Sequence, residues 1–327
     1  MTLSHPLENN ILLGNPPWGK DHLRKCYFQD SQRTRKEINN LTGGLIWNEL
    51  KSLRLSLNIF LDAVDDLINS INKFKVESTR PEFWYTINHH FADKLETSIQ
   101  RGILSSAMCA MALVEHSRVF NKKYPVSEYQ NKIKYYFHNN ERHRFIHSFR
   151  RYVSHIKFTK ANWKIIYTKE GRSVYFILDK DTLLEFNDWH SLAKKFISKY
   201  SEGINVEELF DKYSDEVKNF HNWLRISVLD TYGDKISEYL NYLRIINSFS
   251  LEIKWNIIVH QFLLPKNIDP YMYLDRYLTE EELEEVFSLS HRSKEQVDRI
   301  IHLVDSYKIC SDELKRQLYK ICKVKKT

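Results

Sequence analysis

Residues 45–74 read LIWNELKSLRLSLNIFLDAVDDLINSINKF, and this stretch decides the fold class. Its apolar residues alternate spacings of four and three over about four heptads, which is the pattern of one continuous helical seam. A helix of about 30 residues is roughly 45 Å long and needs a packing partner along its whole length. We expect that partner to be another helix of the same chain rather than a second subunit. The seam consists of Ile46, Leu50, Leu53, Leu57, Phe60, Val64, Leu67, Ile71 and Phe74.

Two further helices are predicted after this seam. Residues 103–114 are apolar and small nearly all round, which favours a long helix in the centre of a bundle or partly in a subunit interface. Pro125 and Ser127 then open a third helix, which continues into residues 142–155. Three long helices with short connections predict a helical bundle.

Composition restricts the class of protein. Of the 327 residues, 42% are hydrophobic, which is enough for a core, and 28% are charged, which excludes a membrane-embedded protein. No apolar run approaches the roughly 18 residues of a membrane span. The four cysteines are scattered, which argues against a zinc site or disulfide framework and favours a cytoplasmic location. The net charge of +7 permits nucleic-acid binding without demonstrating it.

The rest of the chain adds one predicted β-hairpin and more helices. Residues 162–168 and 172–178 are rich in β-branched and aromatic residues and predict the two strands of the hairpin. Further helices are predicted over residues 179–200, 209–228 and 236–249, with Gly233 as a candidate interruption, and over three short C-terminal stretches that include capping boxes at Thr279 and Ser293.

The predicted fold class is therefore mainly α: a long-helix bundle with one β-hairpin and a small helical C-terminal region. Pro265 and Pro270 mark the best candidate boundary. The expected segments are an irregular N-terminal segment (1–44), a helical bundle (45–160), the hairpin plus helices packed on the bundle (161–264) and the helical C-terminal region (265–327).

The stretch most suited to chemistry is residues 142–155, which read RHRFIHSFRRYVSH. Phe145, Phe149, Tyr152 and Ile156 recur at helical spacing and predict a helix with one face in a core. The other faces carry arginines, which hold phosphates by paired donors, and histidines, which exchange protons near neutral pH. The simpler alternative is that these side chains form only a solvated basic surface.

This pattern resembles the HEPN superfamily (higher eukaryotes and prokaryotes nucleotide-binding), in which a late helix of a bundle carries an arginine, four to six residues, and then a histidine. Residues 145–155 (FIHSFRRYVSH) are similar to that segment, and residues 112–118 (ALVEHSR) are similar to the helix before it. Arg150 and His155 would be the motif pair. The resemblance implies a metal-independent, cofactor-free endoribonuclease that acts as a homodimer on RNA. It is typical of a toxin or antiviral effector with a partner protein such as an antitoxin.

The resemblance gives His155 the role of acid or base and gives an arginine the stabilisation of phosphoryl charge. On a continuous helix Arg150 and His155 lie roughly 140° apart, whereas Arg151 and His155 share one face, so either arginine could act. Arg142 and His147 form a second pair with the same spacing, which we treat as incidental. Arg144, His147 and Tyr152 are the expected substrate-binding residues.

Two alternative functions are also compatible with the sequence. The first is a non-enzymatic helical module that binds RNA, nucleotide or a partner protein through the same basic face. The second, more remote, is an N6-adenine methyltransferase, because Asn15-Pro-Pro-Trp18 resembles the catalytic tetrapeptide of those enzymes. The chain has no Gly-x-Gly to cradle its S-adenosylmethionine cofactor. The simpler interpretation of that tetrapeptide is a Pro-Pro turn with Trp18 packed on the domain.

Overall fold

The computed structural model describes residues 13–155, 161–169 and 171–324, and for Ser154, His155 and Thr168 it describes only the backbone. The chain forms two compact units. Unit 1 combines residues 1–45 with 234–327, and unit 2 comprises residues 46–233. This division differs from the four consecutive segments expected from the sequence, because the N-terminal segment packs with the C-terminal part of the chain.

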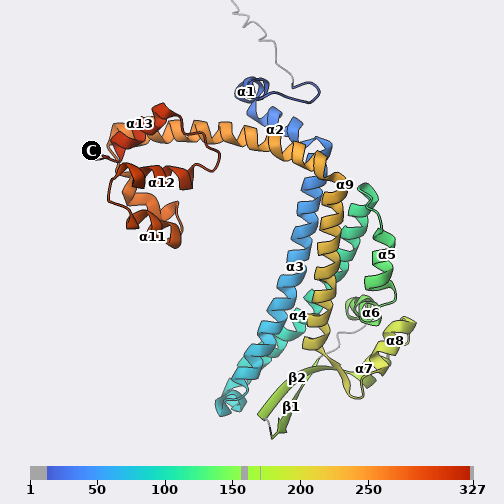
Figure 1. The fold of residues 1–327 in the computed structure, drawn as a ribbon. Helices are drawn as coiled ribbons and strands as arrows, with labels where there is room; N and C mark the ends of the chain where they lie inside the picture. Colours follow the sequence, from blue (N-terminus) through green and yellow to red (C-terminus); the bar gives the residue numbers. More distant parts are fainter. Residues whose placement is uncertain (1–12, 156–160, 170, 325–327) are drawn as a thin grey trace, which may run out of the picture. The chain divides into compact units, whose positions relative to one another are not determined.

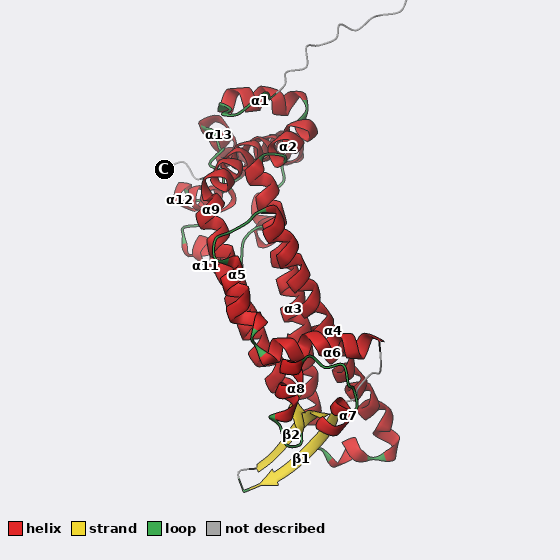
Figure 2. Ribbon diagram, turned by 90° about the vertical axis from the view of Figure 1, so that its right-hand side faces the viewer, coloured by secondary structure: helices red, strands yellow, loops and turns green. Residues whose placement is uncertain are grey.

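Unit 2 contains the predicted bundle. Figure 1 shows α3, α4 and the first part of α9 running alongside one another, and Figure 2 shows the strands gathered in one small sheet. Its elements are α3 (Thr42–Glu77) from residue 46 onward, 3₁₀ turns at Pro81–Trp84 and Thr86–Asn88, α4 (His89–Lys123), α5 (Tyr129–Ile133), a π-helical turn (Lys134–His138), α6 (Glu141–His155), β1 (Asn162–Thr168), β2 (Gly171–Asp179), α7 (Lys180–Leu184), α8 (Ser191–Ser198), β3 (Gly203–Asn205) and residues 206–233 of α9 (Val206–Ile257).

The seam on α3 confirms the first sequence prediction. Eight of its nine residues are buried, and Leu57 is half-buried. The partners are helices of the same chain: the Phe60 ring lies 5.9 Å from that of Tyr213 on α9. The Ser106 hydroxyl on α4 donates to the carbonyl of Ala63 at 3.1 Å. The mainly α fold, with long helices, is therefore as the sequence predicts.

The predicted hairpin forms, and a third short strand extends it. β1 and β2 pair antiparallel with Ile165 opposite Val174, and β3 pairs with the far edge of β2. Val174, Phe176 and Leu178 alternate toward the core, as expected for a strand with one buried face. The Phe176 ring packs edge-on against Phe74 of α3 at 5.0 Å, which fixes the sheet to the bundle.

Unit 1 contains the short helices. Its elements are α1 (Lys20–Gln29), α2 (Ser31–Asn39), the first residues of α3, residues 234–257 of α9, a π-helical turn (Ile258–Leu263), α10 (Leu264–Lys266), a 3₁₀ turn (Pro270–Arg276), α11 (Glu280–Ser288), α12 (Lys294–Val304) and α13 (Asp312–Ile321). Both predicted N-caps form, but only one is a full capping box: Thr279 and Glu282 exchange both hydrogen bonds, whereas the Ser293 hydroxyl accepts from the Gln296 backbone N–H while the Gln296 side-chain oxygen accepts from the Arg292 N–H.

Three local predictions are corrected by the structure. Residues 20–39, expected to be irregular, form α1 and α2 because Asp30 caps α2 and a stripe with Leu23 and Ile38 is buried. Gly233 does not interrupt α9, since one helical glycine costs only about 1 kcal/mol. Residues 179–200 form two short helices rather than one, because the Trp189 indole donates to the carbonyl of Leu183 at 2.7 Å where α7 ends.

The third predicted helix is also divided. After α5 the backbone widens into the π-helical turn Lys134–His138 and is interrupted before Glu141, where α6 begins. The amide side chain of Asn140 contributes to the restart, because its oxygen accepts from the backbone N–H of His143 at 3.2 Å. Helix α6 is therefore a separate element whose basic residues are presented by its own packing.

Candidate functional site

Helix α6 has one fully buried face. Phe145 and Phe149 are inaccessible to solvent, and Tyr152 is nearly so, which confirms the predicted amphipathic helix. The Phe145 ring stacks on Trp189 at 5.5 Å, and the Tyr152 ring lies 5.7 Å from the same indole. Tyr152, expected to bind substrate, therefore lies in the core. The remaining predicted member of this face, Ile156, is outside the described residues.

His143 lies beneath the surface of α6. Its Nδ1 atom is 2.9 Å from the hydroxyl of Tyr213 on α9. The pKa of His143 is lowered to about 3, chiefly by burial and also by repulsion from His147 and Arg144. The imidazole is neutral at pH 7, and the Tyr213 hydroxyl keeps its proton because burial raises its pKa. This pair therefore supports the helix from within rather than contacting a ligand.

Replacing Tyr213 with phenylalanine should lower the free energy of unfolding by about 1–3 kcal/mol, because a buried ring nitrogen of His143 would lose its partner. The measurement is urea denaturation followed by circular dichroism. Tyr135→Phe is the matched control, since that side chain is 76% exposed and its hydroxyl should contribute less than about 0.5 kcal/mol. Equal effects of the two substitutions would contradict this role.

Arg142 is held by an ion pair with Glu216 of α9. The Asn140 amide also donates to that carboxylate, at 2.9 Å. The pKa of Glu216 lies above its ordinary value because burial outweighs the stabilisation by Arg142. Arg142 thus joins α6 to α9.

His147 is exposed on the surface of α6. Its pKa lies below the ordinary value, first because the ring is partly desolvated and then because of the charges of Arg144, Arg150 and Arg118. Arg118 comes from α4, so two helices supply the surrounding cations. We call His147, Arg118, Arg144 and Arg150 the His147 cluster. The combination of a neutral, accessible imidazole with fixed positive charges suits proton transfer beside a phosphate.

Two of the arginines in this cluster are oriented by nearby groups. Arg144 donates from Nε to the carbonyl of His138 at 3.0 Å, and its Nη2 lies 2.7 Å from the His138 Nδ1 atom. Arg118 donates to Glu115, one turn earlier, at 2.6 Å. The Glu115 carboxylate partly offsets the effect of these cations, although the pKa of His147 still lies below its ordinary value. Such exposed pairs are weak, so both guanidinium groups remain able to contact a phosphate.

The predicted motif pair lies at the end of the same helix. Arg150 is half-buried, and Arg151 is exposed. Arg151 donates to the carboxylate of Asp188 at 3.2 Å and to its backbone carbonyl at 3.1 Å. His155 is the last residue of α6, and its side chain lies outside the described part of the structure. The pairing of His155 with Arg150 or Arg151 therefore stays a prediction.

Arg118 is the functional candidate that sequence reasoning missed. It ends the stretch 112–118 that resembles a HEPN helix, but nothing in its local pattern places it beside His147. Their proximity depends on how α4 packs against α6, which is a tertiary feature.

The tetrapeptide Asn15-Pro-Pro-Trp18 lies in unit 1, where Asn15 is exposed and Trp18 is buried. The Trp18 ring lies 4.8 Å from that of Tyr242, and its backbone N–H donates to the Tyr242 hydroxyl at 3.1 Å. The indole is thus engaged in packing, as the simpler interpretation expects.

Comparisons with protein-family models, with curated proteins and with solved structures found no match to this chain. None of the described helices combines the length and apolarity needed to span a lipid bilayer. Among the residues that the structure describes, no three His, Cys, Asp or Glu side chains are grouped so that they could hold a metal ion.

Proposed function

We propose that this protein is a metal-independent endoribonuclease of the HEPN type that uses an imidazole of α6 for proton transfer. The observation that carries the proposal is the accessible His147, whose pKa is lowered by partial desolvation and by the charges of Arg144, Arg150 and Arg118. A neutral imidazole can accept a proton at pH 7, and fixed guanidinium groups can stabilise charge on phosphoryl oxygens.

In the proposed reaction the 2′-hydroxyl oxygen of RNA bonds to the adjacent phosphorus while the imidazole takes the hydroxyl proton. The bond from phosphorus to the 5′-oxygen breaks, and that oxygen receives a proton from a second acid. The products are a 2′,3′-cyclic phosphate and a 5′-hydroxyl. Arginines of the His147 cluster, or Arg150 or Arg151 beside His155, would bind the phosphoryl oxygens.

His147 and His155 are alternative positions for the acting imidazole. Eight helical residues separate them by about 12 Å along the axis, so a single phosphate would meet one of them more readily than both. A homodimer would supply a second imidazole from the other copy. This dimer belongs to the proposal, as do RNA as substrate, an antitoxin or defence-system partner and a role as toxin or phage-defence effector. The proposed location is the cytoplasm, and the four cysteines form no disulfide.

The test is incubation of the full chain with total RNA in excess chelator, followed by mapping of 3′ ends. His147→Ala or His155→Ala should reduce cleavage by about 100-fold or more, the usual contribution of an acid–base group. His116→Ala is the control, because this α4 imidazole is exposed and lies 2.7 Å from the Ser56 hydroxyl, outside the proposed machinery. Full cleavage in the His147→Ala, His155→Ala double variant would remove both imidazoles from the reaction.

A specific observation favours a second candidate, the non-enzymatic RNA-binding module. Tyr135 is 76% exposed on the π-helical turn that also carries His138, the contact of Arg144. The Lys132 ammonium lies 6.0 Å from the Tyr135 ring. Exposed aromatic rings beside cations stack on unpaired bases. In the same assay, RNA that is bound but left intact by the wild-type chain would select this candidate.

A further inference from the structure

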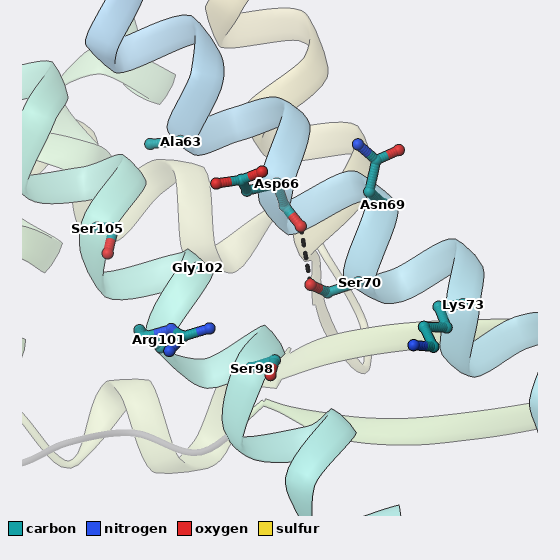
Figure 3. A pocket seen from close by; sticks show the side chains of 9 residues that line it. All are labelled: Ala63, Asp66, Asn69, Ser70, Lys73, Ser98, Arg101, Gly102 and Ser105. Carbon is teal, nitrogen blue, oxygen red and sulfur yellow. Dashed lines mark hydrogen bonds between the residues drawn. The ribbon is translucent and has the colours of Figure 1, made fainter.

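A groove between α3 and α4 is the second chemically equipped site of unit 2. It encloses about 380 Å³, within the range of small-molecule sites. Figure 3 looks into it: Asp66, Ser70 and Lys73 come from α3, and Ser98, Arg101 and Ser105 come from α4. No residue of α6 lines it, so it is independent of the proposed nuclease site.

The groove exists because α4 presents small residues toward α3. Ser98, Gly102 and Ser105 recur at helical spacing, and none carries a side chain large enough to fill the space between the helices. Gly102 packs directly on Leu67, since a Cβ atom there would lie 3.0 Å from the Leu67 Cβ. The two helices therefore approach closely at Gly102 and Leu67, at the floor of the groove, and the small side chains leave the groove open to solvent.

Two cations line the groove, and among the described residues neither has an ion-pair partner. Across residues 13–155, 161–169 and 171–324, neither Lys73 nor Arg101 forms an ion pair, although Lys75 two positions along α3 pairs with Glu207 at 2.6 Å. The Lys73 ammonium instead lies 5.9 Å from the Phe91 ring. Both cations line the same groove, which makes the groove suited to an anionic ligand such as a phosphate ester.

The hydroxyls in the groove indicate what else the ligand carries. Ser70 donates its proton to the carbonyl of Asp66 at 2.8 Å, and Ser98 donates to the carbonyl of Lys94 at 3.0 Å. With those protons committed, both oxygens offer lone pairs to the groove, and the Asp66 carboxylate offers more. These groups accept hydrogen bonds, so they fit a ligand that donates from hydroxyls.

We propose that this groove binds a phosphate monoester that also bears hydroxyl groups, of which a sugar phosphate is the simplest. Arg101 and Lys73 hold the phosphate, while Ser70, Ser98 and Asp66 accept from the hydroxyls. The ribose phosphate unit of an RNA end has the same chemistry as a free sugar phosphate, and the choice of probes separates these two sources.

Isothermal titration of the full chain with ribose 5-phosphate, inorganic phosphate and a 5′-phosphorylated oligoribonucleotide tests this site. Ribose 5-phosphate should bind saturably and more tightly than inorganic phosphate. Arg101→Gln and Lys73→Gln should each weaken it about tenfold or more, as expected for a charge-assisted contact. The control Arg54→Gln removes the same charge from an exposed position of α3 outside the groove and should change little.

The remaining outcomes are also decisive. Asp66→Asn should reduce the preference for ribose 5-phosphate over inorganic phosphate, because it weakens the acceptor for the sugar hydroxyls. Tight binding of the oligonucleotide alone that Arg101→Gln weakens would assign the groove to RNA ends, and tight binding of both ligands with the same sensitivity would assign it to the free sugar phosphate as well. Equal affinity for phosphate and ribose 5-phosphate would overturn the hydroxyl assignment. No saturable binding, or binding that Arg101→Gln leaves intact, would overturn the site.

Discussion

Substitution of Gly43 with alanine is expected to lower the free energy of unfolding of unit 1 by about 4 kcal/mol or more, the range of severe core substitutions. Gly43 lies in the first turn of α3 and contacts the backbone of α9. A Cβ atom there would lie 1.8 Å from the carbonyl oxygen of Lys235 and 2.4 Å from its carbon. Both atoms belong to the backbone of a long helix, so the helices must separate to admit the methyl group.

The matched control is Gly233→Ala, two positions before Lys235 on α9. No atom lies within 4 Å of the Cβ that this substitution adds. Alanine is favoured over glycine in a helix by about 1 kcal/mol, so this variant should be stabilised. Urea denaturation followed by circular dichroism measures both changes. Loss of stability in both variants, or in neither, would show that close approach of the helices at Gly43 is not required.

The same two glycines show what sequence could and could not predict of the fold. The α3 seam identified its helix because nine apolar residues at regular spacing need a continuous partner. The sequence also suggested an interruption at Gly233, but α9 continues through it. Nothing local distinguishes Gly233, which is merely tolerated, from Gly43, which is needed for close approach. That distinction depends on which helix passes nearby.

Helices α1 and α2 were missed for a related reason. Each is short, and its buried stripe has few members, such as Leu23 on α1 and Ile38 on α2. Both contact partners more than 200 positions away: the Arg24 guanidinium of α1 pairs with Glu252 at 2.8 Å, and Arg35 of α2 donates to Asn247 at 2.9 Å. Short helices depend on tertiary packing more than on local propensity.

For the candidate site, the sequence predicted the helix and its buried face but not the state of each basic residue. Nothing in the sequence distinguishes the surroundings of Arg142, His143 and His147. In the structure, Arg142 is ion-paired to Glu216, His143 is buried beside Tyr213, and His147 is accessible. Those differences come from α9, which lies about 70 positions further along the chain. Residue types therefore identified the candidate helix, and packing decided which of its basic side chains are accessible to solvent.

Acidification from pH 7 to pH 5 is expected to lower the free energy of unfolding of unit 2 by about 4 kcal/mol. The cause is a pair of buried histidines, His143 and His221, whose pKa values burial lowers from 6.5 to about 3 and about 4. Between those pKa values and 6.5 the unfolded chain binds protons that the folded chain excludes. The free energy of unfolding therefore falls as the pH falls through this window, and the stabilisation is fully present above pH 6.5. Each histidine contributes about 1.4 kcal/mol per pH unit over the interval of about 1.5 units from pH 6.5 to pH 5, so the two together contribute about 4 kcal/mol.

Other titratable groups also change the free energy of unfolding between pH 7 and pH 5. His147, with its lowered pKa, destabilises in the same direction, whereas Glu216, whose pKa burial raises, takes up a proton in the folded state and opposes the effect. Carboxylates with lowered pKa values, such as Glu141, lose their stabilisation only below their ordinary value of 4.5, outside the interval compared. The two buried imidazoles therefore dominate between pH 7 and pH 5.

Urea denaturation at pH 7, 6 and 5 measures this dependence. His221→Gln should be less stable than the wild type at pH 7, because it disturbs the packing beside Ser117, but should lose about 2 kcal/mol less on acidification. The exposed His116→Gln should keep the full wild-type pH dependence. If His221→Gln is as pH-sensitive as the wild type, then His221 of the wild type must take up its proton in the folded state as well. Its burial would then not be the source of the acid sensitivity.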